Sequence, residues 1–315
     1  MLVERGPDGP VIRHREQVPS DAGSSVVIDG IVGVARSLFE RFPDADGVGV
    51  GLAGFVDRYG VVRSAPNSPG LIGRDVRGLL VAELGVPVVV DNDANCAAVA
   101  AHAVSAPDAR HLVAVTFGTG IGGGLIVDGR LVHGARGFAG EPGHMVVDPE
   151  GPLCPCGQHG CWERYASGSG LAWLARLAVE RGDAPALAAV VGDPADLRGE
   201  HVTELLHTGD PGVTAVFDTY AGWVALGVAN LINLLDPDVV VLGGGVIAMG
   251  EELLGRVRAF VAERYPAASD GRDVPIIGSP GGPAAGALGA ALLVHVGATG
   301  GWSMPPSNSE DRQRI

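Results

Sequence analysis

The chain has 315 residues, of which 46% are hydrophobic and 18% charged, and its 36 acidic against 22 basic residues give a net charge of −14. This length fits one large globular domain or two of ordinary size, with a sizeable core. The acidic balance excludes nucleic acid or an anionic membrane as the main partner, but not nucleotides, which proteins hold with backbone amides and a metal ion.

The sequence contains no segment that suggests export or a membrane anchor. Residues 1–20 lack the apolar stretch of a signal peptide. The longest apolar region, residues 223–242, is interrupted by Asp236, Pro237 and Asp238 and is too broken to cross a bilayer. Because three of the four cysteines form a cluster of metal-ligand type, we expect a reducing cytoplasmic location.

The first hundred residues alternate between short apolar runs and stretches with apolar residues at helical spacing. The run at 86–90 is apolar throughout, as in strands covered on both faces. We expect strands over residues 11–18, 48–52 and 86–90, a hairpin turn over 54–62, and helices over 24–39, 75–84 and 94–104.

The pentapeptide from Asp91 to Asn95 follows a predicted strand at its carboxyl end. Ligands of open α/β sheets gather at this end of the strands, so two carboxylates and two amides there suggest a polar ligand and a general base. An Asp/Asn-rich turn that caps the next helix explains the same residues equally well. The pentapeptide alone leaves both readings open.

Two predicted strands run directly into glycines. Residues 118–124 contain five glycines in seven positions, and the strand over 239–242 is followed by Gly243, Gly244 and Gly245. Exposed backbone amides of such turns form anion nests, while a glycine-rich bulge is the plainer alternative. Neither GxxxxGK[ST] nor a GxGxxG that opens a helix is present, because the first stretch leads into a predicted hairpin over 125–133.

The remaining elements continue the alternation of strands and helices. This pattern predicts an α/β fold with partly parallel sheets in two lobes that face a cleft. We expect strands over 111–117, 239–242 and 275–277, helices over 169–180, 185–191, 201–208, 213–235, 251–265 and 284–296, a small domain of residues 1–98 plus 284–297, a large domain of residues 99–283, and a disordered tail over 298–315.

One stretch carries an unusual density of metal-binding side chains. Cys154, Cys156 and Cys161 lie within eight residues, and His144 precedes them. One imidazole and three thiolates match the ligand set of a closed tetrahedral structural zinc site. The alternative is a disulfide with a spare thiol, although three cysteines cannot all pair within the cluster.

Other residues with reactive side chains lack a pattern of partners. Cys96 lies on an apolar helix and is expected to pack as a small hydrophobe. Trp162 either lines a pocket or packs beneath the cysteine loop. The histidines at 102, 111, 133 and 159 are expected to be surface residues or hydrogen-bonded core residues.

Taken together, these motifs resemble the ROK family of bacterial sugar kinases and sugar-responsive repressors, over residues 11–296. The cysteine stretch is similar to the family's zinc signature from Gly143-His144 through Cys154, Cys156 and Cys161 to Glu163. Asn92-Asp93 resembles the catalytic dipeptide, Gly118-Thr119-Gly120 the second phosphate loop, and Gly243-Gly244-Gly245 the adenosine loop. The resemblance implies the two-lobed actin-like ATPase (ribonuclease H-like) fold.

The resemblance also implies a reaction, the phosphorylation of a hexose, glucose first, at its 6-hydroxyl by ATP with Mg²⁺. Asp93 would be the general base, and zinc would be structural. Backbone amides at Gly118, Thr119 and Gly120, with Gly243 and Gly244, would hold the nucleotide. The implied sugar contacts are Asn67, Asn92, Asp93, Glu141, His144 and Glu163, with His144 shared between sugar and zinc. Sugar and ATP are the expected partners, in a homodimer or homotetramer.

One family motif is not found in this sequence. The first phosphate loop of the family, Asp-x-Gly-Gly-Thr, does not occur before Val11, and residues 1–20 resemble the segment that follows it. We expect a gene model that starts too late rather than a true loss, which would put the activity of this chain in doubt. The alternatives are therefore a sugar-binding regulator or non-catalytic ROK protein, and a kinase for another sugar such as N-acetylmannosamine or fructose.

Overall fold

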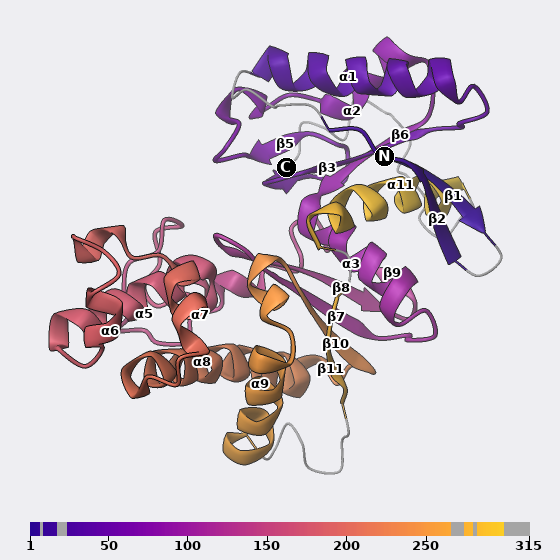
Figure 1. Cartoon of the computed structure of the whole chain (residues 1–315). Helices are drawn as coiled ribbons and strands as arrows, with labels where there is room; N and C mark the ends of the chain where they lie inside the picture. Colours follow the sequence, from indigo (N-terminus) through magenta and orange to yellow (C-terminus); the bar gives the residue numbers. More distant parts are fainter. Residues whose placement is uncertain (7–8, 18–23, 266–273, 280–281, 299–315) are drawn as a thin grey trace. The chain divides into compact units, whose positions relative to one another are not determined.

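The computed structural model describes residues 1–6, 9–17, 24–265, 274–279 and 282–298 (Figure 1). The chain divides into two compact units, each built from separate stretches: unit 1 is Met1–Ala100, His133–Ala139 and Gly286–Ile315, and unit 2 is Ala101–Val132 and Gly140–Ala285. The sequence gives no sign of the return of His133–Ala139 to unit 1, and the domain limits expected at 98 and 284 stay a prediction. Nearly all of the expected tail lies outside the described residues.

Unit 1 contains three two-stranded sheets in the described part of the chain. The strands β1 and β2 pair antiparallel, β3 and β6 parallel, and β4 and β5 antiparallel. Its elements are β1 (Leu2–Gly6), β2 (Gly9–His14), α1 (Ser24–Arg41), β3 (Val48–Leu52), β4 (Phe55–Val56), β5 (Val62–Ser64), η1 (Pro69–Leu71), α2 (Val76–Leu84), β6 (Val88–Asn92), most of α3 (Asp93–Ser105) and α11 (Ala285–Ala298).

Local chemistry explains the limits of α2. The Asp75 side chain accepts a hydrogen bond from the Gly78 amide at 2.8 Å, and Gly85 ends the helix in the left-handed conformation with φ 69°. The buried residues of α2 join those of α1, β3 and β6 in one core. The helix α11 lies directly on β3 in the same unit, because a Cβ on Gly49 would collide with the Ala290 carbonyl.

Unit 2 is built on a five-stranded sheet in the order β11-β10-β7-β8-β9. The strand β10 is parallel to both β7 and β11, whereas β8 is antiparallel to β7 and β9. Its elements are β7 (Leu112–Phe117), β8 (Ile121–Val127), β9 (Arg130–Leu131), η2 (Pro142–His144), α4 (Glu163–Ala166), α5 (Gly168–Arg181), α6 (Pro185–Ala188), η3 (Pro194–Asp196), α7 (Gly199–Leu206), α8 (Pro211–Leu235), β10 (Val239–Gly243), η4 (Gly245–Met249), α9 (Glu251–Arg264), β11 (Ile276–Gly278) and η5 (Gly282–Ala284).

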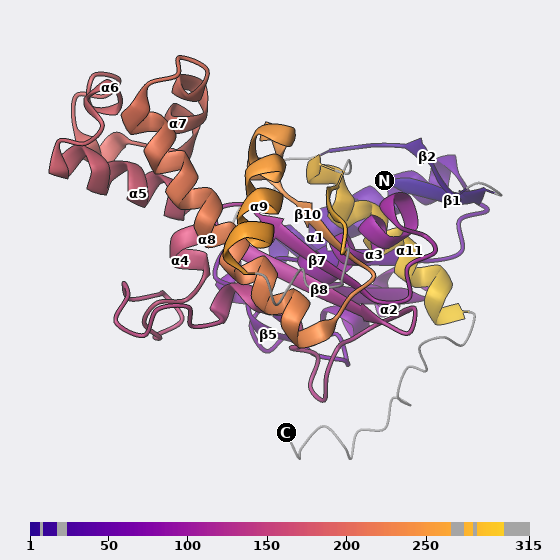
Figure 2. The ribbon, with the colours of Figure 1, turned by 90° about the horizontal axis from the view of Figure 1, so that it is seen from below.

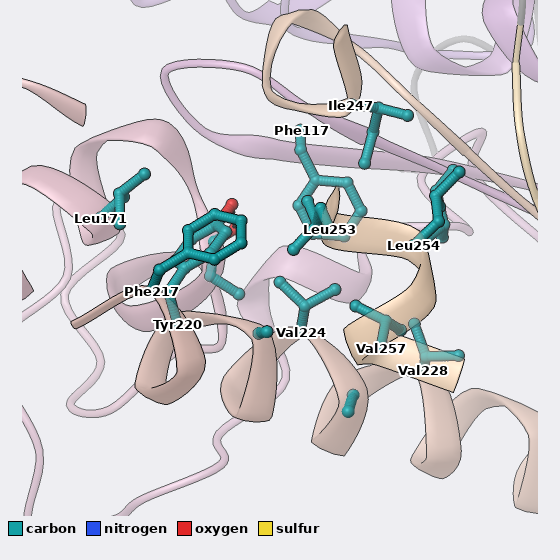
Figure 3. Close-up of a cluster of buried hydrophobic side chains, with 14 of the residues drawn as sticks. Phe117, Leu171, Phe217, Tyr220, Val224, Val228, Ile247, Leu253, Leu254 and Val257 are labelled. Carbon is teal, nitrogen blue, oxygen red and sulfur yellow. Dashed lines mark hydrogen bonds between the residues drawn. The ribbon is translucent and has the colours of Figure 1, made fainter. Parts of the chain in front are cut away.

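The core of unit 2 lies between this sheet and the helices α8 and α9 (Figure 3). Phe117 from β7 meets Leu253 from α9 and Val224 from α8, all fully buried. Burial of such a side chain contributes about 1.5–3 kcal/mol relative to exposure. Figure 2 shows α5, α6 and α7 gathered at one end of α8.

The helix α8 is the one described helix with the length and hydropathy of a membrane span. In its most apolar window, 67% of the residues are buried inside the protein, so α8 behaves as the core helix of a globular unit. The apolar residues of α8 pack against α5, α7 and α9.

The predicted α/β class with partly parallel sheets is confirmed, and most predicted elements are present. Three local differences separate the observed elements from the predicted ones. The strand expected over 11–18 is the second arm of the β1–β2 hairpin, and the short helix α4 was not expected. The glycine stretch turns only at residues 118–120, because Gly122 and Gly124 lie inside β8, opposite Thr116 and Ala114.

Candidate active site

The four predicted zinc ligands lie together in unit 2. His144, Cys154, Cys156 and Cys161 each offer one ligand atom, and these atoms all lie within 4.8 Å of one another. The thiols of Cys156 and Cys161 are 3.5 Å apart, and all cysteines of the chain are free. The expected gathering of one imidazole and three thiols is therefore present, and the disulfide alternative is not.

The chemistry of this donor set fits a closed zinc site. The Nδ1 atom of His144 is buried and has no hydrogen-bond partner among the described residues, which is costly unless a cation or water occupies the site. Burial raises the pKa of Cys154, and that of Cys161 to about 12. For Cys156, hydrogen bonds from the Gln158 backbone and the two other thiols outweigh desolvation and lower the pKa. A divalent cation would favour all three thiolates.

Short backbone contacts hold the cysteine loop in shape. The Cys154 amide donates to the Gln158 carbonyl at 2.8 Å, and the Gly157 amide donates back to the Cys154 carbonyl at 2.9 Å. Isolated antiparallel bridges join Val146 to Cys161 and Leu153 to His159. The loop is thus folded back on itself, which places the side chains of the three cysteines close together.

Two aromatic residues anchor this loop to the core. Trp162 is fully buried, and its ring nitrogen donates to the Trp223 carbonyl of α8 at 2.7 Å. Tyr165 stacks on the Trp223 ring, with centroids 4.1 Å apart, and its hydroxyl donates to the Asp148 carboxylate at 2.7 Å. Trp162 therefore packs beneath the loop, which is one of the two roles expected for it.

The carboxylate of Glu163 links this loop to the first glycine turn. Glu163 is the first residue of α4, and its Oε2 atom accepts a hydrogen bond from the Ile121 amide at 2.8 Å. Gly120 lies so close that an added Cβ would collide with the same oxygen. Glu141 precedes η2, and its carbonyl accepts from the His144 amide at 3.2 Å.

The two glycine turns lie at neighbouring strand ends in unit 2. Because β7 and β10 are parallel, with Thr116 opposite Gly243, the turns after them share one edge of the sheet. The carbonyls of Gly118 and Thr119 accept from the Gly168 amide and the Ser169 hydroxyl, both at 2.8 Å. The Gly118 amide donates to the Gly120 carbonyl, while no described residue accepts from the Thr119 and Gly120 amides. Those two amides are available to an anionic group.

In unit 1, the pentapeptide forms the junction between β6 and α3. The Asn92 side chain accepts hydrogen bonds from the Ala94 and Asn95 amides at 2.8 and 3.1 Å and donates to the Gly54 carbonyl at 2.9 Å. Asn92 thus caps α3, as one of the two readings of the pentapeptide expected. The cap fixes the backbone on both sides of Asp93. A helix cap at Asn92 is therefore compatible with a ligand-binding role for Asp93.

The Asp93 carboxyl has the properties of a base. Asp93 begins α3, and its side chain is exposed. Desolvation by the surrounding protein nevertheless raises the pKa of this carboxyl, against the opposing effect of the Ala94 and Asp93 amides. A carboxylate with a raised pKa that solvent still reaches can accept a proton from a bound hydroxyl.

Asn67 lies in the same unit, in an exposed turn between β5 and η1. The Ser68 amide closes this turn on the Ala65 carbonyl at 3.0 Å. Ala65 is also close to Gly54, the residue whose carbonyl holds the Asn92 side chain. The turn that carries Asn67 therefore starts beside Gly54, the residue that binds the Asn92 side chain.

The sequence profile of the ROK family matches residues 8–296. The chain is 34% identical over 293 residues to a glucokinase of Streptomyces coelicolor, covering 90% of both chains. The chain belongs to the ROK family.

Solved structures of ROK proteins share its fold. The ROK glucokinase of Streptomyces griseus, in complex with glucose and AMPPNP, matches with a TM-score of 0.75 at 32% identity, covering 92% of this chain and 93% of that one. The ROK hexokinase of Thermus thermophilus matches with a TM-score of 0.77 at 32% identity, covering 94% and 93%. The predicted actin-like ATPase fold is thereby confirmed.

The family also contains proteins named as regulators. A xylose repressor of Bacillus spizizenii is 26% identical over 293 residues, covering 91% of this chain and 72% of the repressor. Membership of the ROK family therefore does not by itself decide between a kinase and a regulator.

In this ROK protein, sequence reasoning missed two side-chain pairs beside the candidate site. Asp91 binds His133 at 2.6 Å, and Asp148 receives the Tyr165 hydroxyl. Both pairs join residues 17 or more positions apart, and no local pattern connects them. Cys96, in contrast, is fully buried as expected, and burial raises the pKa of its thiol.

Proposed function

We propose that this ROK protein is an ATP-dependent hexose kinase that phosphorylates the 6-hydroxyl of glucose. The observation that carries the proposal is the Asp93 carboxyl, which the fold presents to solvent at a strand end with a raised pKa. The glucokinase relatives at about one-third identity support the choice of a hexose as the substrate class.

The proposed roles divide between the two units. Asp93 accepts the proton of the 6-hydroxyl as that oxygen attacks the γ-phosphate. The open amides of Thr119 and Gly120 bind phosphate oxygens, with Gly118 in the same turn and with Gly243 and Gly244 beside the adenosine. Mg²⁺ bound with ATP would supply neutralisation of the phosphate charge. The proposed sugar contacts are Asn67, Asn92, Asp93, Glu141, His144 and Glu163.

The proposed zinc ion is structural. His144, Cys154, Cys156 and Cys161 would fill all four positions of a tetrahedral ion and leave none for a nucleophile. Their loop carries Glu163 and His144 on a frame that Trp162 and Tyr165 fasten to α8. The metal site would therefore fix sugar contacts rather than take part in the chemical step.

The charge and the free thiols of the chain support a proposal on its location and partners. We propose a cytoplasmic enzyme with small-molecule partners only, since the net charge is −14 and the three cysteines of the proposed metal site are free thiols. A homo-oligomer, either a dimer or a tetramer, is proposed by resemblance to the family.

The test is a coupled ADP-release assay with Mg²⁺-ATP and a panel of hexoses that includes mannose, fructose, N-acetylglucosamine and N-acetylmannosamine. We expect glucose to give the highest kcat/KM. In the variant Asp93→Asn, kcat should fall by about 10²–10⁴-fold, the usual contribution of a general base. Calorimetry should show glucose binding to this variant within about threefold of the wild type, because an amide keeps the hydrogen-bonding shape. Substantial turnover by Asp93→Asn would refute the assignment of the base.

A sugar-binding regulator is the second candidate, favoured by the similarity to a xylose repressor. The same panel separates the two candidates. A 315-residue protein that binds a sugar in calorimetry, yet releases no ADP with any member of the panel, would favour the regulator.

A further inference from the structure

The carboxylate of Asp91 lies at the centre of the junction between β6 and α3. Asp91 is only 4% exposed, one of few buried charged or polar residues among those described. A buried carboxylate is costly unless hydrogen bonds replace its water. The two oxygens of Asp91 therefore need donors, and the structure provides three.

Two of these donors are local. The Oδ1 atom of Asp91 accepts from the Asn92 amide at 2.7 Å and from the Asn95 side chain at 2.8 Å. Asn95 also gives its backbone amide to the Asn92 side chain. Asn92 and Asn95, which lie on either side of Asp93 in the chain, thus both bind the Asp91 carboxylate directly. Ala94 is connected to it through the Asn92 side chain.

The third donor comes from a distant part of the chain. The Nε2 atom of His133 lies 2.6 Å from the Oδ2 atom of Asp91, and both side chains are at most 9% exposed. His133 opens the segment His133–Ala139, which belongs to unit 1 although unit 2 residues flank it. Phe138 of this segment contacts Phe55 with ring centroids 5.5 Å apart, and the Ala139 amide donates to the His133 carbonyl at 3.1 Å.

From this arrangement we propose that His133 is a positioning residue for Asp93, acting through Asp91. Without the His133 donor, Oδ2 of Asp91 must find water or turn away, and either movement disturbs the bonds that Oδ1 makes to Asn92 and Asn95. The turn that carries Asp93 then loses its fixed geometry. This inference rests on the proposed role of Asp93, and a displacement of about 1 Å in a catalytic group costs about 10²-fold in rate.

The test compares His133→Ala with His133→Gln, whose side-chain amide keeps an N–H donor near the position of Nε2. His207→Ala serves as the matched control, because His207 is exposed at the end of α7. In His133→Ala, kcat should fall by at least about tenfold while the KM for sugar changes by less than about threefold. His133→Gln and His207→Ala should stay within about threefold of the wild type in both constants.

A second readout does not depend on turnover. Hydrogen–deuterium exchange of peptides that contain Ala94 and Asn95 should become about tenfold faster or more in His133→Ala, and stay unchanged in His133→Gln. If the wild type phosphorylates no hexose, the proposed function fails, but the exchange data still decide whether His133 fixes this turn. If His133→Ala does not fold, His133→Asn, whose shorter amide cannot reach Asp91, replaces it. Folded Ala or Asn variants with kcat near the wild-type value and unchanged exchange would overturn the proposal.

Discussion

Asp93 illustrates how a single carboxyl can favour reactivity at the expense of stability. Desolvation raises its pKa, which means that the folded protein disfavours the ionised form relative to the unfolded chain. A base needs this ionised form and gains basicity from the same effect. The contribution of Asp93 to stability is therefore greatest in acid, and it is lost as the pH rises through the folded-state pKa.

We predict that Asp93→Asn is more stable than the wild type near neutral pH. The amide cannot ionise, so the penalty for a desolvated charge disappears. The difference in Tm between the two proteins should shrink as the pH falls toward the unfolded-state pKa of about 3.9. Thermal unfolding followed by circular dichroism over this pH range checks the sign, and a variant that is less stable near neutrality would contradict it.

The activity of the wild type should show the corresponding pH dependence. A general base works only when ionised, so kcat should fall as the pH drops through the Asp93 pKa, which lies above the ordinary aspartate value. The acid limb of the kcat/KM profile for glucose measures this pKa in the free enzyme. An acid limb at or below the ordinary value would argue against desolvation of Asp93.

Gly120 tests the contact between the glycine turn and Glu163. An alanine there would push the Glu163 carboxylate off the Ile121 amide. A displaced Glu163 loses its proposed hydrogen bond to the sugar. Because a hydrogen bond to a charged group is worth about 1.5–3 kcal/mol, Gly120→Ala should raise the sugar KM about tenfold or more. The control is Gly255→Ala on α9, where an added Cβ meets nothing within 4 Å. Steady-state kinetics that show equal effects of the two substitutions would rule out the proposed contact.

At this scale, the sequence identified residues that belong to a compact motif and missed residues that pair across long loops. The compact motifs are the four candidate zinc ligands, His144 and the three cysteines, and the dipeptide Asn92-Asp93. Their residues are close in sequence, so the sequence alone indicates their chemistry. Asp91 and His133 are 42 positions apart, and only the return of residues 133–139 to unit 1 brings them together. His133 was expected to be an ordinary surface or core histidine because sequence patterns carry no information on that return.

The cysteine loop is the element that carries most of the proposed sugar contacts of unit 2. It has almost no regular secondary structure, and its shape rests on a few backbone bonds, the Trp162 and Tyr165 anchors and the four candidate ligands. Removal of a metal would leave buried thiols and the Nδ1 atom of His144 without a counterpart. Structural zinc sites contribute folding free energy directly, so the loop should loosen without its ion.

We predict that chelation lowers the Tm and raises the KM for sugar by about tenfold, the size of effect that a disturbed ligand environment usually has. The KM for ATP should change far less, and re-addition of zinc should restore both values. Elemental analysis must first confirm one zinc per chain and its loss after treatment. Metal-free protein with unchanged sugar affinity would refute the coupling. The metal should also dissociate more readily in acid, where protons compete for the thiolates.

Among the elements, those with strong local signals were the most predictable. The helix α2 has an aspartate cap and a terminal glycine, and its limits agree with the sequence within one residue. The strand over the glycines at 122–124 was harder to predict, because glycine is rare in strands and indicates a loop. Pairing of residues 121–126 with β7 overrides that preference. The 3-10 helices and α4 are too short to show helical periodicity in the sequence.

At the scale of the whole molecule, the proposed ligands should stabilise the fold. A ligand that binds only the folded state adds about 2.7 kcal/mol at a concentration of 100 times its Kd. We predict that glucose raises the Tm by several degrees, while an equal concentration of a non-binding sugar such as xylose does not. Differential scanning fluorimetry measures this shift without any need for turnover. A larger shift with xylose than with glucose would favour a regulator of the kind named among the relatives.

The division of the chain into two interleaved units has a consequence for its synthesis. The helix α11 lies on β3 in unit 1, yet it follows the whole of unit 2 in the chain. The ribosome therefore synthesises unit 2 before it synthesises α11, the helix that completes unit 1. During that interval, β3 and α3 lack their cover, and an apolar surface that the finished protein hides is open to chaperones. Stop-codon variants that end before Ala285 should consequently aggregate in the cell, even though all strands of unit 2 have been made.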